Sequence, residues 1–446
     1  MIRVCVSTNS PPAIPLIEIG GAGRTWEQGI DYRRGVGGVV PMMRSFMRAA
    51  AGKLIEPNPY WLAVAGAETW PDYIQTNEGF RLVYAALPDK WKPGYTRFKE
   101  AIWRAMHDVK PFDFPVEDYR MFREFGNAVA SKLLGLRENI DAYYVNDYQQ
   151  VQLGSMIGPA APTVFHWHGP ARFESFPFGV RKFVLNQMEC FDAVCVSTHR
   201  DMERLNRVAH FEKTYQVYPF LDPKESRRVG AGETFQFRLK WGLNDYPTFL
   251  CVARMDEQKR QDILLRAFAK IVKLNPDTRL MLVGDGSFSG LKVGGLASNS
   301  PNEWRDKLLA LTKELGIEDK VVFTGYLLDD DLQAAYSMCE AFVLPSPVEG
   351  FGLTAIESWF HERPIIVTSG AGVSELVNPG VNGYVAVPGS VESLRGYMQE
   401  ILRGTNDTIQ MGKEGALSAR VCHAERAVPK LKQVFEDVLA GYPSQK

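Results

Sequence analysis

Short apolar runs alternate with amphipathic stretches along almost the whole chain, and this alternation constrains the fold more than any other feature of the sequence. Apolar runs of about four to eight residues are typical of buried strands, and the stretches between them have the period of helices. Strands and helices that alternate in this way form parallel sheets with helices on both faces. Strands are expected in a first series at 2–7, 60–65, 80–86, 142–146, 163–168, 193–197 and 215–218, and in a second at 249–253, 279–283, 321–324, 341–344, 365–368 and 383–387, with helices such as 263–274 and 303–315 between them.

A polar segment at residues 221–246, which contains proline, glycine and a cluster of charges and is expected to be irregular, separates the two series of strands. We therefore expect an N-terminal Rossmann-like domain over 1–222 and a C-terminal one over 223–425. A final helix is expected over 426–446, and the sequence leaves open whether this helix crosses back to the first domain. The predicted fold class is α/β, with two Rossmann-like doubly wound domains that face each other across a cleft. Because open parallel sheets bind ligands beyond the carboxyl ends of their strands, the cleft is the expected active site.

The composition is that of an ordinary globular protein, with 446 residues, 45% hydrophobic and 23% charged, and a formal net charge of -1. A chain with so little net charge has no overall field that would attract nucleic acid or an anionic membrane. No apolar run reaches the roughly 18 residues of a membrane span, and the first residues have the pattern of a strand rather than a signal peptide. We expect a cytoplasmic protein with no membrane span and no nucleic-acid partner, and the sequence leaves a homo-oligomer open.

The segment at 345–357 combines a glycine-bracketed helix start with two carboxylates. A nucleotide-sugar presents a sugar, a pyrophosphate and a ribose diol in a line, and this segment offers a group for each. Glu349 would hold hydroxyls of the sugar, and Glu357 would accept hydrogen bonds from the ribose. Backbone N–H groups would point at the phosphates from the positive end of the helix dipole, namely those of Gly350, Phe351, Gly352 and Leu353. An ordinary strand, turn and helix of an α/β domain is the alternative interpretation.

Two cations follow the first strand of the second series, because Arg254 lies just past the strand end and Lys259 five positions on. Both would reach one pyrophosphate, with about 4 kcal/mol of Coulomb energy each at about 4 Å and an effective dielectric near 20, before desolvation. They would also stabilise a leaving diphosphate as its charge develops. A solvated charge run at a turn is the alternative.

A second glycine-rich helix start lies in the first half, where Gly37 and Gly38 precede an apolar helix at 39–50. These glycines would bring backbone amides close to the donor phosphates or to the acceptor. A plain tight turn is the alternative. His166 and His168 end a strand on one face, and His168, nearest the expected cleft, is the better candidate for a functional imidazole.

At these residues the chain resembles the retaining glycosyltransferases of family four, which include glycogen synthases, sucrose-phosphate synthases and many mannosyltransferases. The resemblance rests on Arg254 and Lys259, on Gly284-Asp285-Gly286 after a strand, and on the stretch 349–357. It implies a GT-B fold, a nucleotide-diphosphate sugar as donor, no required metal or other cofactor, and retention of anomeric configuration. It also implies that Arg254 and Lys259 contact the diphosphate, that Glu349 contacts the donor sugar, and that Glu357 contacts the ribose.

The first half is similar to trehalose-phosphate and glucosylglycerol-phosphate synthases. The residues that carry this likeness are Gly37-Gly38, the aromatic stretch 95–107, Asn146-Asp147-Tyr148 and His168-Gly169-Pro170. By that likeness Asp147 and His168 line the pocket for the acceptor and the donor sugar. Those enzymes carry an arginine after the first strand, where this chain has Ser7-Thr8-Asn9-Ser10. If the acceptor carries a phosphate, the candidates to replace that arginine are Arg24, Arg33 and Arg34 in the long loop at 10–38.

Several other patterns are interpreted as structural. Asp329-Asp330-Asp331 contains the Asp-x-Asp that binds a metal in the other glycosyltransferase architecture, but a helix N-cap with acidic first-turn residues explains it. The methionines at 42, 43 and 47 are expected in the core, and 286–301 is expected to be a surface loop. The six cysteines have no zinc-site spacing, so reduced and mostly buried thiols are expected.

The expected activity is transfer of a hexose, with retention, to a small sugar, sugar phosphate or polyol. Glucose and a uridine diphosphate are the favoured donor parts, and a trehalose-type synthase is the specific expectation. Arg254 and Lys259 would balance the charge of the diphosphate, while Glu349 and His168 would orient the sugar. The alternatives are a nucleotide-sugar epimerase on the same fold, a mannosyltransferase that uses a GDP-sugar, and a non-catalytic sugar-nucleotide sensor.

Overall fold

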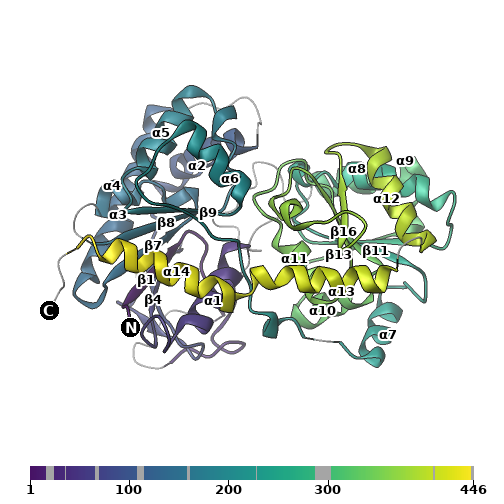
Figure 1. Cartoon of the computed structure of the whole chain (residues 1–446), viewed down its shortest axis with the longest axis horizontal. Coiled ribbons are helices and arrows are strands. Elements are labelled where there is room, and N and C mark those ends of the chain that lie inside the picture. Colours follow the sequence, from purple (N-terminus) through teal and green to yellow (C-terminus); the bar gives the residue numbers. More distant parts are fainter. Residues whose placement is uncertain are drawn as a thin grey trace. The chain divides into compact units, whose positions relative to one another are not determined.

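The computed structural model describes residues 1–16, 25–35, 37–65, 70–107, 115–157, 161–227, 229–286, 303–404 and 407–442. The chain divides into two compact units. The first contains Met1–Asp222 and Ala424–Lys446, and the second contains the intervening residues from Pro223 to His423, apart from a short undescribed segment. Figure 1 shows that each unit has a central sheet with helices on both faces, as expected from the alternation of strands and helices. The predicted α/β class with two Rossmann-like units is confirmed.

The first unit has an eight-stranded sheet in the order β10-β9-β8-β7-β1-β4-β6-β5. All neighbouring strands pair in parallel except β5, which is antiparallel to β6 at the edge. The strands are β1 (Val4–Thr8), β4 (Tyr60–Ala65), β5 (Ile74–Gln75), β6 (Arg81–Ala86), β7 (Ala142–Asn146), β8 (Thr163–Trp167), β9 (Ala193–Val196) and β10 (Thr214–Gln216). The chain runs from β1 to β4 on one side and later returns to β7 on the other, so the strand order reverses between β1 and β7.

Successive side chains of these strands alternate between two apolar layers, as the period of a strand requires. Cys5 faces the layer formed with α2 (Lys92–Met106), α3 (Val116–Gly135) and α5 (Phe178–Met188). Val4 and Val6 face the opposite layer, formed with α1 (Val39–Ala50) and α14 (Ala424–Leu439). The remaining helical segments are α4 (Leu153–Ile157), α6 (His199–Val208), η1 (Arg137–Asn139), η2 (Tyr148–Gln150) and η4 (Phe173–Ser175).

The last helix of the chain completes the core of the first unit. α14 lies beside α1 (Figure 1). Phe46 of α1 has its ring centroid 5.5 Å from that of Tyr144 on β7 and 6.4 Å from that of Phe435 on α14. These three fully buried rings join a strand and both helices in one contact. The predicted C-terminal helix thus begins at Ala424 and packs on the first unit.

The second unit has a six-stranded parallel sheet in the order β13-β12-β11-β14-β15-β16. Its strands are β11 (Thr248–Val252), β12 (Arg279–Val283), β13 (Val321–Gly325), β14 (Ala341–Leu344), β15 (Ile365–Thr368) and β16 (Gly383–Ala386). Its helical segments are α7 (Ala231–Lys240), α8 (Gln261–Val272), α9 (Glu303–Leu315), α10 (Asp329–Met338), α11 (Leu353–Phe360), α12 (Val391–Arg403), α13 (Thr408–Ser418), η5 (Pro223–Glu225), η6 (Glu257–Lys259), η7 (Glu318–Lys320), η8 (Gly372–Leu376) and η9 (Ala419–Cys422). Here the strand order reverses between β11 and β14.

The structure corrects three expectations. The segment 221–246 was expected to be irregular, but it contains α7, whose Phe237 is buried. The early loop contains an antiparallel ribbon of β2 (Ala13–Pro15) and β3 (Tyr32–Arg34). Leu328 is the N-cap of α10, so the three aspartates occupy the first turn rather than the cap. Most of the expected surface loop at 286–301 lies outside the described residues.

Smaller expectations about side-chain placement hold. Met42, Met43 and Met47 are buried in the core of the first unit. All six cysteines are free and five are buried, whereas Cys190 is exposed.

We predict opposite effects for two glycine-to-alanine substitutions in neighbouring helices of the second unit. A Cβ at Gly412 in α13 would lie 1.8 Å from the carbonyl oxygen of Glu362, whereas one at Gly396 in α12 would meet nothing within 4 Å. Gly412→Ala should therefore destabilise the unit by roughly 1–3 kcal/mol, because the backbones must separate. Gly396→Ala should stabilise it by up to about 1 kcal/mol through helix propensity. Thermal unfolding of both variants is the measurement, and equal shifts would contradict the packing of α13.

Candidate active site

The candidate donor-binding residues lie where the strand order of the second sheet reverses. Arg254 and Lys259 follow β11, and the segment from Ser346 to Gly352 follows β14, which pairs directly with β11. Ligands of open parallel sheets bind at such a reversal, beyond the carboxyl ends of the two strands. The fold thus brings together residues that are about ninety positions apart in the sequence.

The central contact of this site is an ion pair between Lys259 and Glu349. The Lys259 ammonium donates a hydrogen bond to the Glu349 carboxylate. The side chains are only 16% and 19% exposed, respectively. The sequence predicts that Lys259 binds the phosphates and that Glu349 binds the sugar. It does not predict that the two residues contact each other. The pair links the loop after β11 to the loop after β14.

Arg254 is held at the same strand end by its own contacts. Its guanidinium donates to Asp256 at 3.0 Å, and Asp256 caps η6 by accepting a hydrogen bond from the Gln258 amide at 2.9 Å. The backbone carbonyl of Arg254 accepts a hydrogen bond from the Gln261 side chain at 2.7 Å. Asp256 was not assigned a role from the sequence, although aspartate often accepts a hydrogen bond from the backbone amide two residues on in a turn.

Glycines at two strand ends allow the loops of this site to pack closely. Gly284 has φ of 139°, and a Cβ there would lie 1.9 Å from the carbonyl oxygen of Ala253. Gly370 lies beneath the loop after β14, where a Cβ would come within 1.8 Å of the Pro347 carbonyl oxygen. Any side chain at either position would displace the segments that carry Arg254 and Glu349.

Helix α11 begins directly after this loop. Gly352 is its N-cap, with φ of 100° and ψ of 58°, a conformation that glycine adopts without strain. The first turn of a helix leaves its amides without intrahelical acceptors, so those of Leu353 and Thr354 are free of helical bonding. Phe351 is buried and Gly350 packs over Gly372. The helix start therefore has the backbone form that sequence analysis expected of an anion site.

Glu357 lies one turn into α11 and contacts a tyrosine that the sequence did not reveal. The Tyr336 hydroxyl donates to the Glu357 carboxylate at 2.7 Å. Burial raises the pKa of Glu357 to about 7, against the opposing effect of the Tyr336 hydrogen bond, and the nearby charges of Glu225 and Asp329 raise it further. The carboxyl group of Glu357 is therefore divided between its protonated and ionised forms near neutral pH.

In the first unit, Asp147 occupies a strained position at the end of β7. Its φ of 73° and ψ of 158° lie in a region that non-glycine residues rarely adopt. Its carboxylate accepts a hydrogen bond from the Tyr148 amide at 2.9 Å, and burial raises the pKa of Asp147 to about 6. Backbone strain of this kind persists where the surroundings fix the conformation, and it is concentrated at functional sites.

His168 follows the neighbouring strand β8 and lies beside Asp147 in the fold. Its Nε2 is 2.9 Å from Oδ1 of Asn146, and its ring is 4.1 Å from that of His166. Burial lowers the pKa of His168 to about 3, so the imidazole is neutral at physiological pH. His168 is thus suited to orient a ligand by hydrogen bonding rather than to transfer a proton. His166 is buried and bonded to the Tyr144 hydroxyl, which is a structural role.

Tyr95 connects α2 to these strand ends. Its hydroxyl donates to Asn9, which follows β1, and the charge of Asp147 contributes to raising the pKa of Tyr95. We call Asn9, Tyr95, Asn146, Asp147 and His168 the strand-end cluster. It lies where the strand order of the first sheet reverses, between β1 and β7.

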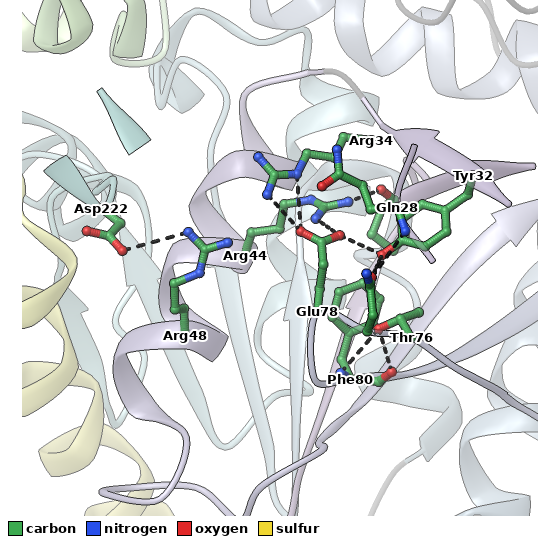
Figure 2. Close-up of polar contacts among 11 residues, drawn as sticks. Gln28, Tyr32, Arg34, Arg44, Arg48, Thr76, Glu78, Phe80 and Asp222 are labelled. Atoms are coloured by element: carbon green, nitrogen blue, oxygen red, sulfur yellow. Dashed lines mark hydrogen bonds and ion pairs between the residues drawn. The ribbon is translucent and has the colours of Figure 1, made fainter. Parts of the chain in front are cut away.

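The glycines before α1 belong to the first unit as well, and a buried arginine fixes the ribbon beside them. Arg44 of α1 donates to Glu78 and to the carbonyl oxygen of Pro12 (Figure 2). Glu78 also accepts from Arg34 at 3.1 Å and from the Tyr32 hydroxyl at 2.8 Å. Arg34 is therefore engaged in this network, and Arg24 lies outside the described residues.

The two glycines have different backbone conformations. Gly37 has φ of 113°, and Gly38 is the N-cap of α1. The ribbon reaches them through Gly35, whose amide donates to the Pro12 carbonyl at 2.8 Å.

Two other kinds of site are absent from the described parts of the chain. No helix there is long and apolar enough to cross a membrane. No group of three or more histidine, cysteine, aspartate or glutamate side chains has an arrangement suited to a metal ion among those residues.

Comparison with solved structures shows the fold. A trehalose-6-phosphate synthase superposes with a TM-score of 0.76 and 14% identity over 99% of both chains. An Anabaena protein solved in complex with UDP and glucose superposes with a TM-score of 0.68 and 15% identity, over 98% of this chain and 100% of the other. These chains are GT-B glycosyltransferases, and the two Rossmann-like units of this chain have the same fold.

Curated relatives match different shares of the chain. The mannosylfructose-phosphate synthase of Agrobacterium fabrum is 30% identical over 206 residues, which are 46% of this chain and 43% of that protein. The N-acetyl-alpha-D-glucosaminyl L-malate synthase of Bacillus anthracis is 24% identical over 88% of this chain and 98% of its own length. The chain spans less than half the length of several curated relatives that it matches.

The family model described as Glycosyl transferases group 1 matches residues 234–418, which form most of the second unit. The matched region contains every candidate donor-binding residue that follows β11 and β14. The second unit of this chain is therefore a group 1 glycosyltransferase domain.

Proposed function

We propose that this protein transfers a hexose from a nucleotide-diphosphate sugar to a small acceptor with retention of anomeric configuration. The observation that carries the proposal is the Lys259–Glu349 pair at the strand reversal of a group 1 domain, beside the start of α11. A cation, a carboxylate and a set of helix-start amides from adjacent strand ends match the phosphates and the sugar of one donor.

The reaction follows from the charges in the site. The bond between the anomeric carbon and the diphosphate oxygen breaks, and Lys259 and Arg254 balance the charge that develops on the diphosphate. The acceptor hydroxyl attacks the same face of the sugar, and its proton passes to the departing diphosphate oxygen. This route uses no carboxylate nucleophile, and the two cations supply the stabilisation without a required metal or cofactor.

The ion pair gives Glu349 and Lys259 linked roles. A bound diphosphate would take the ammonium of Lys259 from Glu349, which frees the carboxylate to accept hydrogen bonds from sugar hydroxyls. Glu357 would accept from the ribose. The strand-end cluster would hold the acceptor, with neutral His168 as a hydrogen-bonding group and Asp147 as an acceptor for hydroxyl groups.

The structural comparisons support glucose and uridine as the first donor parts to test. One similar protein was solved with UDP and glucose, and another is a trehalose-6-phosphate synthase. A mannosyl donor with a guanosine base is the second candidate, because a curated relative is a mannosylfructose-phosphate synthase. Release of nucleoside diphosphate from UDP-, ADP- and GDP-sugars, with and without acceptors, separates these donors. A change in the sugar without any acceptor would instead indicate an epimerase. A cytoplasmic location remains part of the proposal.

We predict that Lys259→Ala lowers turnover by roughly a hundredfold, the scale of losing one charge-stabilising group in a transition state. Lys273→Ala, at an exposed position just after α8, is the matched control and should leave turnover unchanged. Nucleoside diphosphate release under saturating donor is the measurement, repeated with EDTA, which should have no effect. Activity of Lys259→Ala within twofold of the wild type would remove this residue from the mechanism.

We expect Glu349→Gln to separate diphosphate binding from transfer. Without its charged partner, Lys259 is more available to the ligand, so the free nucleoside diphosphate should bind about fivefold more tightly, equivalent to about 1 kcal/mol. Transfer should fall, because the carboxylate no longer orients the sugar. Isothermal titration and turnover assays measure the two effects, with Glu318→Gln on the exposed surface as the control. Weaker diphosphate binding in Glu349→Gln would argue against competition for Lys259.

Nucleotide affinity should depend on pH through Glu357. Because its pKa is about 7, this carboxyl is mostly protonated at pH 6 and mostly ionised at pH 8. Only the carboxylate accepts hydrogen bonds from both ribose hydroxyls, so affinity should rise by up to roughly tenfold over this interval. Glu357→Gln should lack this component and retain only the pH dependence of the phosphates themselves. Identical pH profiles for the two proteins would show that Glu357 does not bind the ribose as a carboxylate.

A further inference from the structure

Lys99 is a buried cation in the first unit for which the described residues provide no paired anion. It lies in the middle of α2, and its side chain is only 2% exposed. Its ammonium is 5.2 Å from the centroid of the Tyr95 ring. Among the described residues, no carboxylate lies within ion-pair distance of this ammonium and no oxygen accepts a hydrogen bond from it.

Such an ammonium is costly to bury, because the protein must replace the water that would solvate it. Burial lowers the pKa of Lys99 to about 8, so the side chain still carries its charge at neutral pH. The Tyr95 ring gives a cation–π contact, which is weaker than the desolvation of a full charge. Glu100, the next residue, contributes only a longer-range charge effect. The ammonium is therefore left without a counter-charge.

The position of Lys99 on α2 places it over the strand ends of the first sheet. Tyr95, Lys99 and Met106 follow each other on one face of the helix, at spacings of four and seven residues. At one end of this face, the Tyr95 hydroxyl contacts Asn9 after β1. At the other end, Met106 packs so closely on Gly169 after β8 that a Cβ there would lie 2.6 Å from its sulfur. Lys99 lies between these two contacts.

Other buried polar groups in the same region lack partners. Both polar atoms of the Gln150 side chain, in the η2 segment that α2 packs against, have no hydrogen bond within the described structure. The same holds for the indole nitrogen of Trp167, at the end of β8. Buried polar groups in native proteins are rarely left unpaired, so a concentration of them indicates a place where a ligand completes the bonding.

We propose that Lys99 recognises an anionic group on the acceptor, either a phosphate ester or a carboxylate. The inference rests on the proposed function, since it assigns the acceptor to the strand-end cluster of the first unit. The hydrogen-bonding groups of that cluster suit the hydroxyls of a sugar or polyol. Lys99 supplies the positive charge that an anionic acceptor needs.

The test compares Lys99→Met with the wild type on glucose, glucose 6-phosphate and glucuronate as acceptors. Methionine has nearly the same length without the charge. We expect the wild type to prefer one of the two anions, and the choice between them identifies phosphate or carboxylate. In Lys99→Met, kcat/KM for that anion should fall roughly ten- to a hundredfold through KM, the scale of a lost charge-assisted hydrogen bond. In the same variant, kcat/KM for glucose should change less than twofold. Lys92→Met, at the partly exposed start of the same helix, removes a lysine that pairs with Asp89 and should resemble the wild type.

Stability measurements separate this role from a structural one. Removal of an uncompensated buried charge should leave the melting temperature of Lys99→Met unchanged or higher. Inorganic phosphate and the preferred anionic sugar should raise the melting temperature of the wild type but not that of Lys99→Met. A lower melting temperature with equal loss on all acceptors would overturn the proposal, as would a wild type that does not discriminate glucose from its anionic derivatives. If no acceptor gives diphosphate release, the proposed function fails, while the melting-temperature comparison still decides the role of Lys99.

Discussion

The ion pair between Lys259 and Glu349 is the contact on which the candidate donor site depends. It joins two loops that leave adjacent strands, and it keeps a partly buried cation and a partly buried carboxylate from facing an apolar environment alone. The same contact prepares the site for an anionic ligand, because the cation is already desolvated and positioned before the ligand arrives. When a diphosphate binds, Lys259 exchanges one negative partner, Glu349, for another. Binding by exchange avoids most of the cost of burying a new charge, and it releases a carboxylate at the moment when sugar hydroxyls need an acceptor.

The backbone around this contact is fixed by close approaches rather than by long side chains. Gly284 and Gly370 lie against carbonyl groups with no space for a methyl group, so the loops after β11 and β14 have little freedom to shift. In the first unit the corresponding strand end carries a strained aspartate, Asp147, instead of a glycine. Both sheets therefore hold polar groups where the strand order reverses. The second sheet does so with closely packed glycines, and the first with a strained aspartate. A ribbon anchored by the buried Arg44 adds a further fixed element beside the start of α1.

Much of the architecture was predictable because apolar periodicity reports burial directly. Strands such as β4 and β7 lie at their expected bounds. The ribbon strands β2 and β3 were missed because a strand of three residues is too short to show a period. The glycines that bracket the start of α11 also made this helix start predictable from the sequence. Pairings between distant residues were not predictable: the bond from Tyr336 to Glu357 and the contact of Lys259 with Glu349 depend on strand order, which a local pattern does not contain. Lys99 was missed for a related reason, since a lysine in an amphipathic helix is ordinarily expected on the outer face.

The return of α14 to the first unit has a consequence for how the chain is made. Phe46 and Tyr144 are synthesised well before their partner Phe435. One apolar layer of the N-terminal sheet, which α1 covers only in part, thus stays incompletely covered while the entire group 1 domain is translated and folds. The nascent protein must protect the exposed part of that layer while about two hundred intervening residues are added, so its dependence on chaperones is expected to last until α14 has been synthesised.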